Sequence, residues 1–489
     1  MTPSSARGRS GRGIGLGAFA RNSVWYAMPP VVAAVVGFAL LPVKARYLST
    51  SDFGLVATAT ALTSVLVILV SAGLSAAVGR FYFDFPEHGS AWRRFLGSAV
   101  LLSLALAVAA ALLLVALGPR LQVLLPAGFR FVPYGLLVTG TVFFTPTFQI
   151  AQSLRVAERL ARPYSLAATA TSVIAAALTS LLLVAGLGAE GALLAQLATA
   201  GAFFALSMWW LLRQSRLAWQ WSAARQALAY GLPFIPHGLS AWITSLSDRL
   251  ILGKMATLSD VGVYSMGYTI ASVVGMAAMA VNLAYSPVFM LRAKEDPQGS
   301  LPLFAELNTT LFAIVVAFAG IVSVYAQELV ATLATAGYKG AAAVIPVVAL
   351  GMVFQGLYYI ASNPIVFAKR AVKYLPLTTA AAAAVNVGLN LWLIPLLGYM
   401  GSAWATVGGF AVLFLAARYL ANRYYRVPID YLALGTITLA AVPMIACTIL
   451  GSTGLLTGMF GLGVKTAAVA AFCAFVMPTR VSRLRREMG

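Results

Sequence analysis

The chain has 489 residues, of which 61% are hydrophobic and only 9% are charged, and its formal net charge is +20. A soluble protein carries about 25% charged residues, so this composition excludes an ordinary soluble domain. It predicts an all-α polytopic membrane protein, because apolar stretches of about 20 residues, long enough to cross a bilayer, recur along the whole chain.

Fourteen such stretches follow one another, and each is expected to form a membrane-spanning helix. The longest connection between them, 213–228, leaves no room for a catalytic domain, and the chain has no phosphate-binding GxxxxGK[ST] run. We therefore predict that the protein is not an enzyme and has no resident cofactor or metal. In chain order, the predicted spans are 24–43, 54–79, 96–117, 131–152, 164–186, 191–212, 229–252, 262–288, 303–325, 340–362, 374–397, 401–420, 432–450 and 455–477.

The basic residues are distributed unevenly between the two sides of these spans. If the N-terminus is cytoplasmic, 25 of the 33 lysines and arginines fall in the two tails and in the loops on that side. Cytoplasmic loops are enriched in Lys and Arg, so both termini are predicted to be cytoplasmic. The net charge is thus a topology signal, and no nucleic-acid partner is predicted.

An internal repeat divides the chain. Ser51-Asp52-Phe53-Gly54 opens the second span and Ser259-Asp260-Val261-Gly262 opens the eighth, 208 residues later, and Ser-Asp before a span is typical of a helix N-cap. Two six-helix repeats with the same orientation imply a pseudo-two-fold axis along the membrane normal. The predicted organisation is a basic cytoplasmic tail (1–22), an N-lobe (23–212), an amphipathic cytoplasmic linker (213–228), a C-lobe (229–428), two extra C-terminal spans (429–478) and a second basic tail (479–489).

The seventh span contains a polar stripe that its repeat partner lacks. Residues spaced three and four apart lie on one face of a helix, and the first span has only Pro and aliphatic residues at the equivalent positions. We therefore expect the stripe to line a watery cavity between the lobes. A polar face packed on other helices, with an ordinary Asp–Arg surface pair, is the alternative. The stripe consists of His237, Ser240, Thr244 and Asp248, followed by Arg249.

Five further polar residues are candidates for a transport path. Arg80 and Asp84 are four residues apart at the inner end of the second span, which suits a gate or a static surface ion pair. Arg46 and Lys254 occupy equivalent outer positions in the repeat, where they attract an anionic group or anchor the helix ends. Asn282, deep in the eighth span, needs a polar partner and is expected to face protein or cavity.

Two amides lie four residues apart in the eleventh span, at Asn386 and Asn390. Amide side chains on one face of a membrane helix commonly hydrogen-bond to a neighbouring helix. We interpret this pair as contacts between helices rather than as a ligand site.

The stretch around the charged pair also resembles a known family. Ser247-Asp248-Arg249, the SDVGVY run at 259–264 and Arg80 at the end of the second span are similar to bacterial polysaccharide-biosynthesis flippases of the multidrug/oligosaccharidyl-lipid/polysaccharide exporter superfamily. The resemblance extends more loosely over the first twelve spans. It implies a monomeric, two-lobed flippase of the bacterial inner membrane that works by alternating access.

The resemblance also implies a substrate and its partners. The substrate would be a polyprenyl-pyrophosphate-linked oligosaccharide, moved to the outer leaflet for surface or exopolysaccharide synthesis, with membrane lipids around it and a glycan polymerase or glycosyltransferases as partners. Coupling to a proton or sodium ion is expected, as in an antiporter, with Asp248 or His237 carrying protonation. Two rival functions remain: a cation-coupled multidrug exporter of the same fold, which should have an acidic cavity, and a membrane glycan polymerase or ligase, which should have a large outer loop.

Overall fold

A computed structural model describes residues 16–85 and 87–488, so most of the predicted tail 1–22 lies outside the described residues. The described residues form helices and short connections, without a β-strand. The α-helices are α1 (Leu16–Ala39), α2 (Leu41–Tyr47), α3 (Thr50–Ser71), α4 (Leu74–Phe81), α5 (Ser90–Leu121), α6 (Leu136–Ala157), α7 (Ala161–Val184), α8 (Gly188–Gln214), α9 (Trp221–Gly231), α10 (Phe234–Met255), α11 (Leu258–Glu295), α12 (Leu301–Val324), α13 (Ala326–Leu333), α14 (Ala341–Phe367), α15 (Leu375–Leu397), α16 (Tyr399–Tyr424), α17 (Tyr431–Ala440), α18 (Val442–Ser452) and α19 (Gly458–Met488). Shorter turns are η1 (Tyr82–Asp84), η2 (Gln122–Leu124), η3 (Phe131–Gly135), η4 (Ala336–Tyr338) and η5 (Val372–Tyr374).

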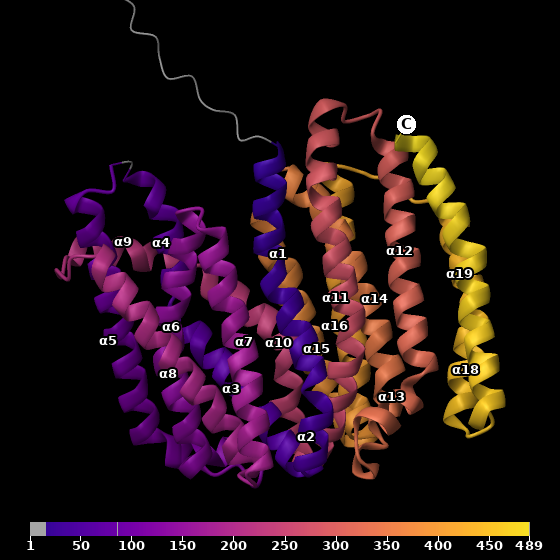
Figure 1. The fold of residues 1–489 in the computed structure, drawn as a ribbon. Helices are drawn as coiled ribbons and strands as arrows, with labels where there is room; N and C mark the ends of the chain where they lie inside the picture. The colour runs from indigo at the N-terminus through magenta and orange to yellow at the C-terminus, as the bar shows by residue number, and fades with distance from the viewer. Residues whose placement is uncertain (1–15, 86, 489) are drawn as a thin grey trace, which may run out of the picture.

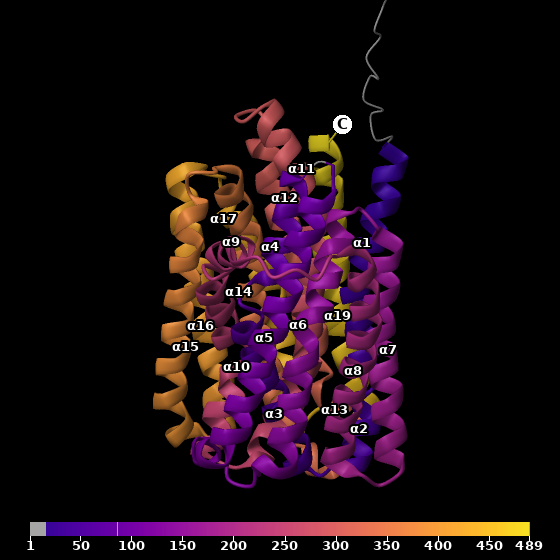
Figure 2. The same cartoon turned by 90° about the vertical axis from the view of Figure 1, so that its left-hand side faces the viewer.

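The long helices are aligned along one common axis, with successive helices running up and down, as expected of a membrane bundle (Figures 1 and 2). Helices α1–α8 form a first lobe and α10–α16 a second, with α9 between them in sequence and α17–α19 appended to the second lobe. We call the end where α1 begins and α19 ends the termini side, and the other end the far side (Figure 1). The predicted all-α polytopic fold, with two six-helix repeats and an extra C-terminal pair, is confirmed.

Thirteen segments of the described chain are long and apolar enough to cross a membrane. They correspond to every predicted span except the seventh, and their number and hydropathy make this a multi-pass membrane protein. The seventh span is α10, a continuous helix of 22 residues that carries the polar stripe. Its polar side chains distinguish it from the other thirteen. The question for this helix is therefore what surrounds those polar side chains.

Three predicted spans are broken into two helices each. The spans at 24–43 and 432–450 break just before Pro42 and Pro443, which lie at the start of α2 and α18, where a proline ring is tolerated. The span at 54–79 breaks at Ala72 and Gly73, both with positive φ. A Cβ on Gly73 would overlap the backbone of Gly231, so this break lets the first lobe approach the end of α9 closely.

The repeated Ser-Asp motifs lie one turn further into their helices than predicted. The residues that cap α3 and α11 are Ser49 and Thr257, each accepting a hydrogen bond of 3.1 Å from a backbone N–H three residues later. Asp52 and Asp260 are those third residues, and the carboxylate of Asp260 in turn accepts a hydrogen bond from the backbone N–H of Thr257 at 3.1 Å. The aspartates are thus not the N-cap residues themselves. They lie three residues after the N-cap, in the position that supports it.

Ion pairs fasten the last helix to the second lobe at both ends. Lys465 donates to Glu328 on α13 at 2.6 Å, and Arg480 lies 3.6 Å from Glu306 on α12. The side chains of Lys465, Arg480 and Glu306 are at least nine-tenths buried. Removing one member of a buried pair leaves an uncompensated charge, so these contacts hold α19 against α12 and α13.

Candidate functional site: a buried polar cluster in the second lobe

The adjacent charges of α10 are buried within protein. Asp248 is 1% exposed and Arg249 is 6% exposed. The Asp248 carboxylate accepts hydrogen bonds from the backbone N–H of Arg249 at 2.8 Å and from its guanidinium Nη1 at 2.9 Å. The other carboxylate oxygen accepts from the hydroxyl of Tyr264 on α11. Asp248 is therefore bonded through both oxygens, and no solvent reaches it in this conformation.

Arg249 has further partners of its own. Its Nη1 also donates to the carbonyl of Ser245 at 2.9 Å, one turn earlier on α10. Its guanidinium carbon lies 4.5 Å from the ring centroid of Tyr268 and 5.8 Å from that of Tyr264. Aromatic faces attract a cation, most strongly where water is excluded, so α11 provides both the hydrogen bond to Asp248 and the aromatic surface around Arg249.

The contacts continue from Tyr264 into α16 and α15. The Tyr264 hydroxyl is 3.0 Å from that of Thr406, and Thr406 donates to the carbonyl of Ser402 at 3.0 Å. Ser402 donates to Asn390 at 2.9 Å, which in turn donates to the carbonyl of Asn386 at 2.9 Å. All are fully or almost fully buried. We call these seven residues the polar cluster: Asp248, Arg249, Tyr264, Asn386, Asn390, Ser402 and Thr406.

The polar cluster belongs to the second lobe alone. The residues of the first lobe equivalent to Asp248, Arg249 and Tyr264 at the repeat offset are Leu40, Leu41 and Val56. Since the first lobe builds the same six-helix unit with aliphatic residues there, the fold itself does not require the charges. Burying a charged pair is a poor source of stability compared with apolar packing. Its presence in one lobe only therefore needs an explanation other than the stability of the fold.

The polar stripe predicted on α10 crosses two environments. His237 is exposed and Ser240 is half-buried, whereas Thr244 and Asp248 are buried against neighbouring helices. Ser240 and Thr244 each donate to a carbonyl one turn earlier on the same helix, at 2.8 and 2.9 Å. The polar face of α10 is thus exposed near the termini side and buried at Asp248, which is part of the polar cluster. The predicted watery lining is therefore wrong for Thr244 and Asp248, which pack on other helices as the alternative held. The surface Asp–Arg pair of that alternative is also wrong, because the pair is buried.

The lobes are sealed together on the far side by the repeated motifs themselves. A Cβ on Gly54 would overlap the carbonyl of Leu258, and one on Gly262 would overlap the carbonyl of Thr50. The hydroxyls of Thr50 and Ser259 are 2.7 Å apart across this junction. The starts of α3 and α11 therefore meet backbone to backbone about the pseudo-two-fold axis, and we call this contact the glycine seal.

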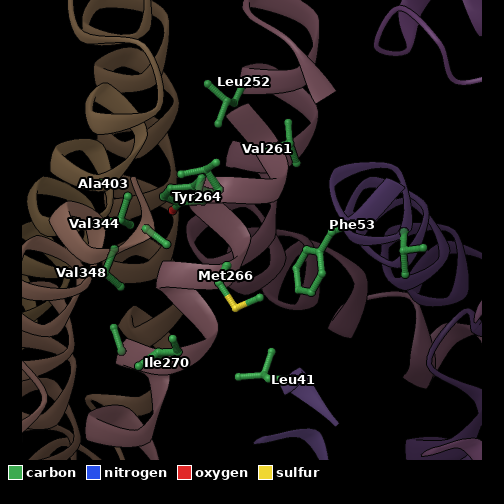
Figure 3. Packing of buried hydrophobic residues seen from close by; sticks show 14 of the residues in the cluster. Leu41, Phe53, Leu252, Val261, Tyr264, Met266, Ile270, Val344, Val348 and Ala403 are labelled. Atoms are coloured by element: carbon green, nitrogen blue, oxygen red, sulfur yellow. The ribbon is translucent and has the colours of Figure 1, made fainter. Parts of the chain in front are cut away.

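Further contacts support the glycine seal. The Tyr338 hydroxyl of the second lobe lies 3.1 Å from the carbonyls of both Leu48 and Ser49 in the first lobe. Behind it, Leu41 and Phe53 of the first lobe share a hydrophobic cluster with Met266 and Ile270 of the second (Figure 3). The far side of the interface is thus closed by both hydrogen bonds and apolar packing.

The termini side is built differently. One hydrophobic cluster there joins α4, α5, α6 and the linker helix α9, and another joins the end of α11 to the start of α12. Neither contains residues of both lobes. Halfway through the bundle, α10 still touches α3, where the Trp242 indole donates to the carbonyl of Ala61 at 3.0 Å. The lobes are therefore joined on the far side and have separate cores on the termini side.

The structure places the other candidate residues apart from the polar cluster. Arg80 and Asp84 form an ion pair of 2.5 Å that is about half exposed on the termini side. On the far side, Arg46 is exposed and Lys254 donates to the carbonyl of Val123 across the lobes at 2.6 Å. Half-buried Asn282 accepts a bond of 2.9 Å from Asn363 on α14, so its partner is protein.

The sequence pattern does not reveal the residues that bond to the charged pair. Tyr264 is part of the SDVGVY run that carries the family resemblance, and nothing in the sequence marks Ser402 or Thr406 as polar partners of α10. Asn386 and Asn390 do connect helices, as interpreted, since Asn386 donates to the carbonyl of Ala405 on α16 at 3.2 Å. Among residues 16–85 and 87–488, no three His, Cys, Asp or Glu side chains gather as a metal site.

Comparisons with known proteins agree with this architecture. The lipid II flippase MurJ, in an inward closed conformation, superposes with a TM-score of 0.71 at 12% identity, over 94% of this chain and 100% of that chain. A multidrug resistance MATE family transporter of the MOP superfamily, in an inward-facing conformation, superposes with a TM-score of 0.62 at 14% identity, over 82% of this chain and 97% of that chain. The chain thus shares the fold of these two membrane proteins.

Sequence comparison gives the family. The Lsg locus putative protein 1 of Haemophilus influenzae is 25% identical over 301 residues, which cover 56% of this chain and 67% of that protein. A family model described as "Polysaccharide biosynthesis protein" matches residues 43–343, more than half of the chain. The protein belongs to this polysaccharide biosynthesis family, as the resemblance implied. None of these comparisons points to an enzyme, in agreement with the prediction.

Proposed function

We propose that this protein flips a polyprenyl-pyrophosphate-linked oligosaccharide from the inner to the outer leaflet of the bacterial cytoplasmic membrane by alternating access. The observation that carries the proposal is the unequal closure of the two lobes, which share a core and the glycine seal on the far side but not on the termini side. With both termini cytoplasmic, this conformation is closed towards the periplasm. Family membership supports a glycan as the cargo.

The exposed part of α10 suits the proposed cargo better than a cationic drug. His237 and half-buried Ser240 belong to a segment without a carboxylate, and the carboxylate of Asp248 is already neutralised by Arg249. A multidrug exporter for cations should instead present an unpaired acidic group to its substrate. The pyrophosphate and hydroxyl groups of a lipid-linked glycan need hydrogen-bond donors and cations, which this chain supplies in excess of its acidic residues.

Ion coupling is part of the proposal, and Asp248 is the residue we assign to it. When its contacts with Arg249 and Tyr264 open, a desolvated carboxylate must be neutralised, by a proton or by a cation such as sodium. The chain of hydroxyls and amides through Thr406, Ser402 and Asn390 links this event to α15 and α16. Binding of the ion would thereby change the packing of the second lobe.

The direct test is transport in proteoliposomes that contain a lipid-linked oligosaccharide. The protein is expected to make the glycan accessible to an external glycan-cleaving enzyme, faster under a proton or a sodium gradient than without one. Vesicles that contain the lipid-linked oligosaccharide but no protein serve as the control. Efflux of cationic dyes without movement of the glycan would favour the multidrug alternative and would reject the proposal.

Alternating access has a separate test at the glycine seal. In a variant lacking both native cysteines, Cys447→Ala and Cys473→Ala, the pair Thr50→Cys and Ser259→Cys replaces two hydroxyls that lie 2.7 Å apart. Oxidation is expected to link the lobes, stop transport and be reversed by a reductant. Each single cysteine variant should transport normally in oxidant. Full transport by the cross-linked protein would show that the far side does not need to open.

A further inference from the structure

A large cavity lies on the flank of the second lobe, away from the contact between the lobes. It is a half-open cavity with a volume of about 890 Å³, lined by α12, α13, α14 and α16 on one side and by α17–α18 on the other, with Lys465 of α19 at one end. Cavities that bind small molecules have volumes of about 300–1,000 Å³. None of its lining residues comes from α1, α3, α10 or α11, the helices that meet between the lobes.

The cavity is elongated along the membrane normal. On α14 its lining runs from Ala342 near the far side to Leu357, a rise of about 22 Å along the helix. Most of the lining is apolar, and it includes Pro346, Leu350 and Phe354 of α14 and Met444 of α18. The hydrocarbon of a bilayer is about 30 Å thick, so the shape fits a lipid chain that enters from the far side.

Polar groups are concentrated at the end near the far side. Lys339, Gln327 and Ser452 line this end, and no Asp or Glu is among the lining residues. Gln327 is already bonded to the carbonyl of Gly451 at 2.7 Å. Lys465 is neutralised by Glu328. Lys339 is exposed, and among the described residues no carboxylate lies within ion-pair distance of it, so it leaves this end positively charged.

We propose that this cavity is a binding site for an anionic phospholipid of the far-side leaflet. Its phosphate would lie at Lys339 and an acyl chain would run between α14 and α18. The charge of Lys339 and the apolar wall match the two parts of such a lipid. The bound chain would fill the space between the six-helix unit of the second lobe and α17–α18. The site does not depend on the transport activity, since it lies outside the contact between the lobes.

Native mass spectrometry of the full chain in detergent tests the site, with phosphatidylglycerol and phosphatidylcholine added at equal concentration. The wild type is expected to retain one phosphatidylglycerol in preference to phosphatidylcholine. Lys339→Ala should weaken this binding about fivefold, the effect of one basic residue near an anionic lipid, and Lys339→Arg should restore it. Arg130→Ala, an exposed cation of the far side outside the cavity, is the matched control and should change nothing.

Variants that fill the cavity test the acyl chain separately. Ala343 and Leu350 both line the cavity and are exposed, so a tryptophan at either position occupies its space without displacing the core. Each is expected to lower lipid retention at least as much as Lys339→Ala does. Unchanged retention in Lys339→Ala and in the filled variants would overturn the site. Equal retention of phosphatidylcholine, or preferential retention of a polyprenyl phosphate, would overturn the assignment to an anionic phospholipid.

Discussion

Replacing Arg249 by alanine is expected to abolish transport and to lower the free energy of unfolding by about 3–5 kcal/mol, because the buried carboxyl group of Asp248 would lose the charge that compensates it. Asp248 is 1% exposed, and Arg249 supplies two of the three hydrogen bonds to its carboxylate. The alanine variant keeps the hydrogen bond from the backbone N–H. It loses both the hydrogen bond from the guanidinium and its positive charge. Thermal unfolding in detergent and transport in proteoliposomes measure the two effects.

A double replacement separates a structural role of the pair from a functional one. Apolar residues in place of a buried ion pair often leave stability unchanged or raise it. The variant with Asp248→Leu and Arg249→Leu imitates the first lobe, which has Leu40 and Leu41 at the equivalent positions. We expect it to be as stable as the wild type but inactive. An active double variant would show that the pair only fills space, and would remove Asp248 from the coupling step.

The exposed pair Arg80–Asp84 is the matched control for this experiment. It has the same chemistry and a shorter separation, 2.5 Å, but both side chains are about half exposed. Exposed ion pairs contribute little to stability. Arg80→Ala should therefore leave the free energy of unfolding close to that of the wild type. A transport defect in this variant, with normal stability, would revive the prediction that this pair is a gate.

Much of the fold was predictable because the membrane imposes strong rules on composition. Every predicted span corresponds to one helix or to a broken pair of helices, and the repeat at offset 208 identified Gly54 and Gly262 as equivalent residues. The helix breaks were less predictable. Pro42 and Pro443 signal two of them, but the third lies at Ala72, which adopts a positive φ that alanine rarely shows, where the chain packs against Gly231.

The candidate site was predictable only in part. Two adjacent charges in an apolar run are costly, so Asp248 and Arg249 could be noticed from sequence. Their partner Tyr264 lies on the next helix and Thr406 is 142 residues further along the chain. Helical periodicity places residues on one face of α10 but does not say what that face meets at each depth. For this reason the stripe was predicted as one watery lining, although Thr244 and Asp248 are buried.

The glycine seal shows how the repeat acts at the level of atoms. The Ser-Asp-x-Gly motif was interpreted as a capping signal, and the cap accounts for its aspartate. The glycine has a different role, because each one faces the backbone of the other repeat. A pseudo-two-fold axis brings equivalent residues together, so a residue that must be small in one lobe must be small in the other.

Alanine at both Gly54 and Gly262 is expected to open the far side and to stop transport. Each added methyl group would overlap a backbone carbonyl, of Leu258 or of Thr50, and a backbone cannot rotate away as a side chain can. Overpacking of this kind costs about 1–3 kcal/mol per site. Inverting a 1:99 equilibrium takes about 5.5 kcal/mol, so two substitutions together should bring the sealed and open conformations to comparable populations.

Spin labels on the two lobes measure this shift directly. Arg130 of the first lobe and Ala336 of the second are both exposed on the far side, and cysteines there can be labelled once Cys447 and Cys473 are replaced. The double alanine variant should show a second, longer distance between the labels, and the wild type a single short one. Gly37→Ala and Gly388→Ala are matched controls, since a Cβ at either position meets nothing within 4 Å. An unchanged distance with normal transport would mean that the glycine seal accommodates both methyl groups without separating the lobes. The tight contact of the two glycines would then have no part in the transport cycle.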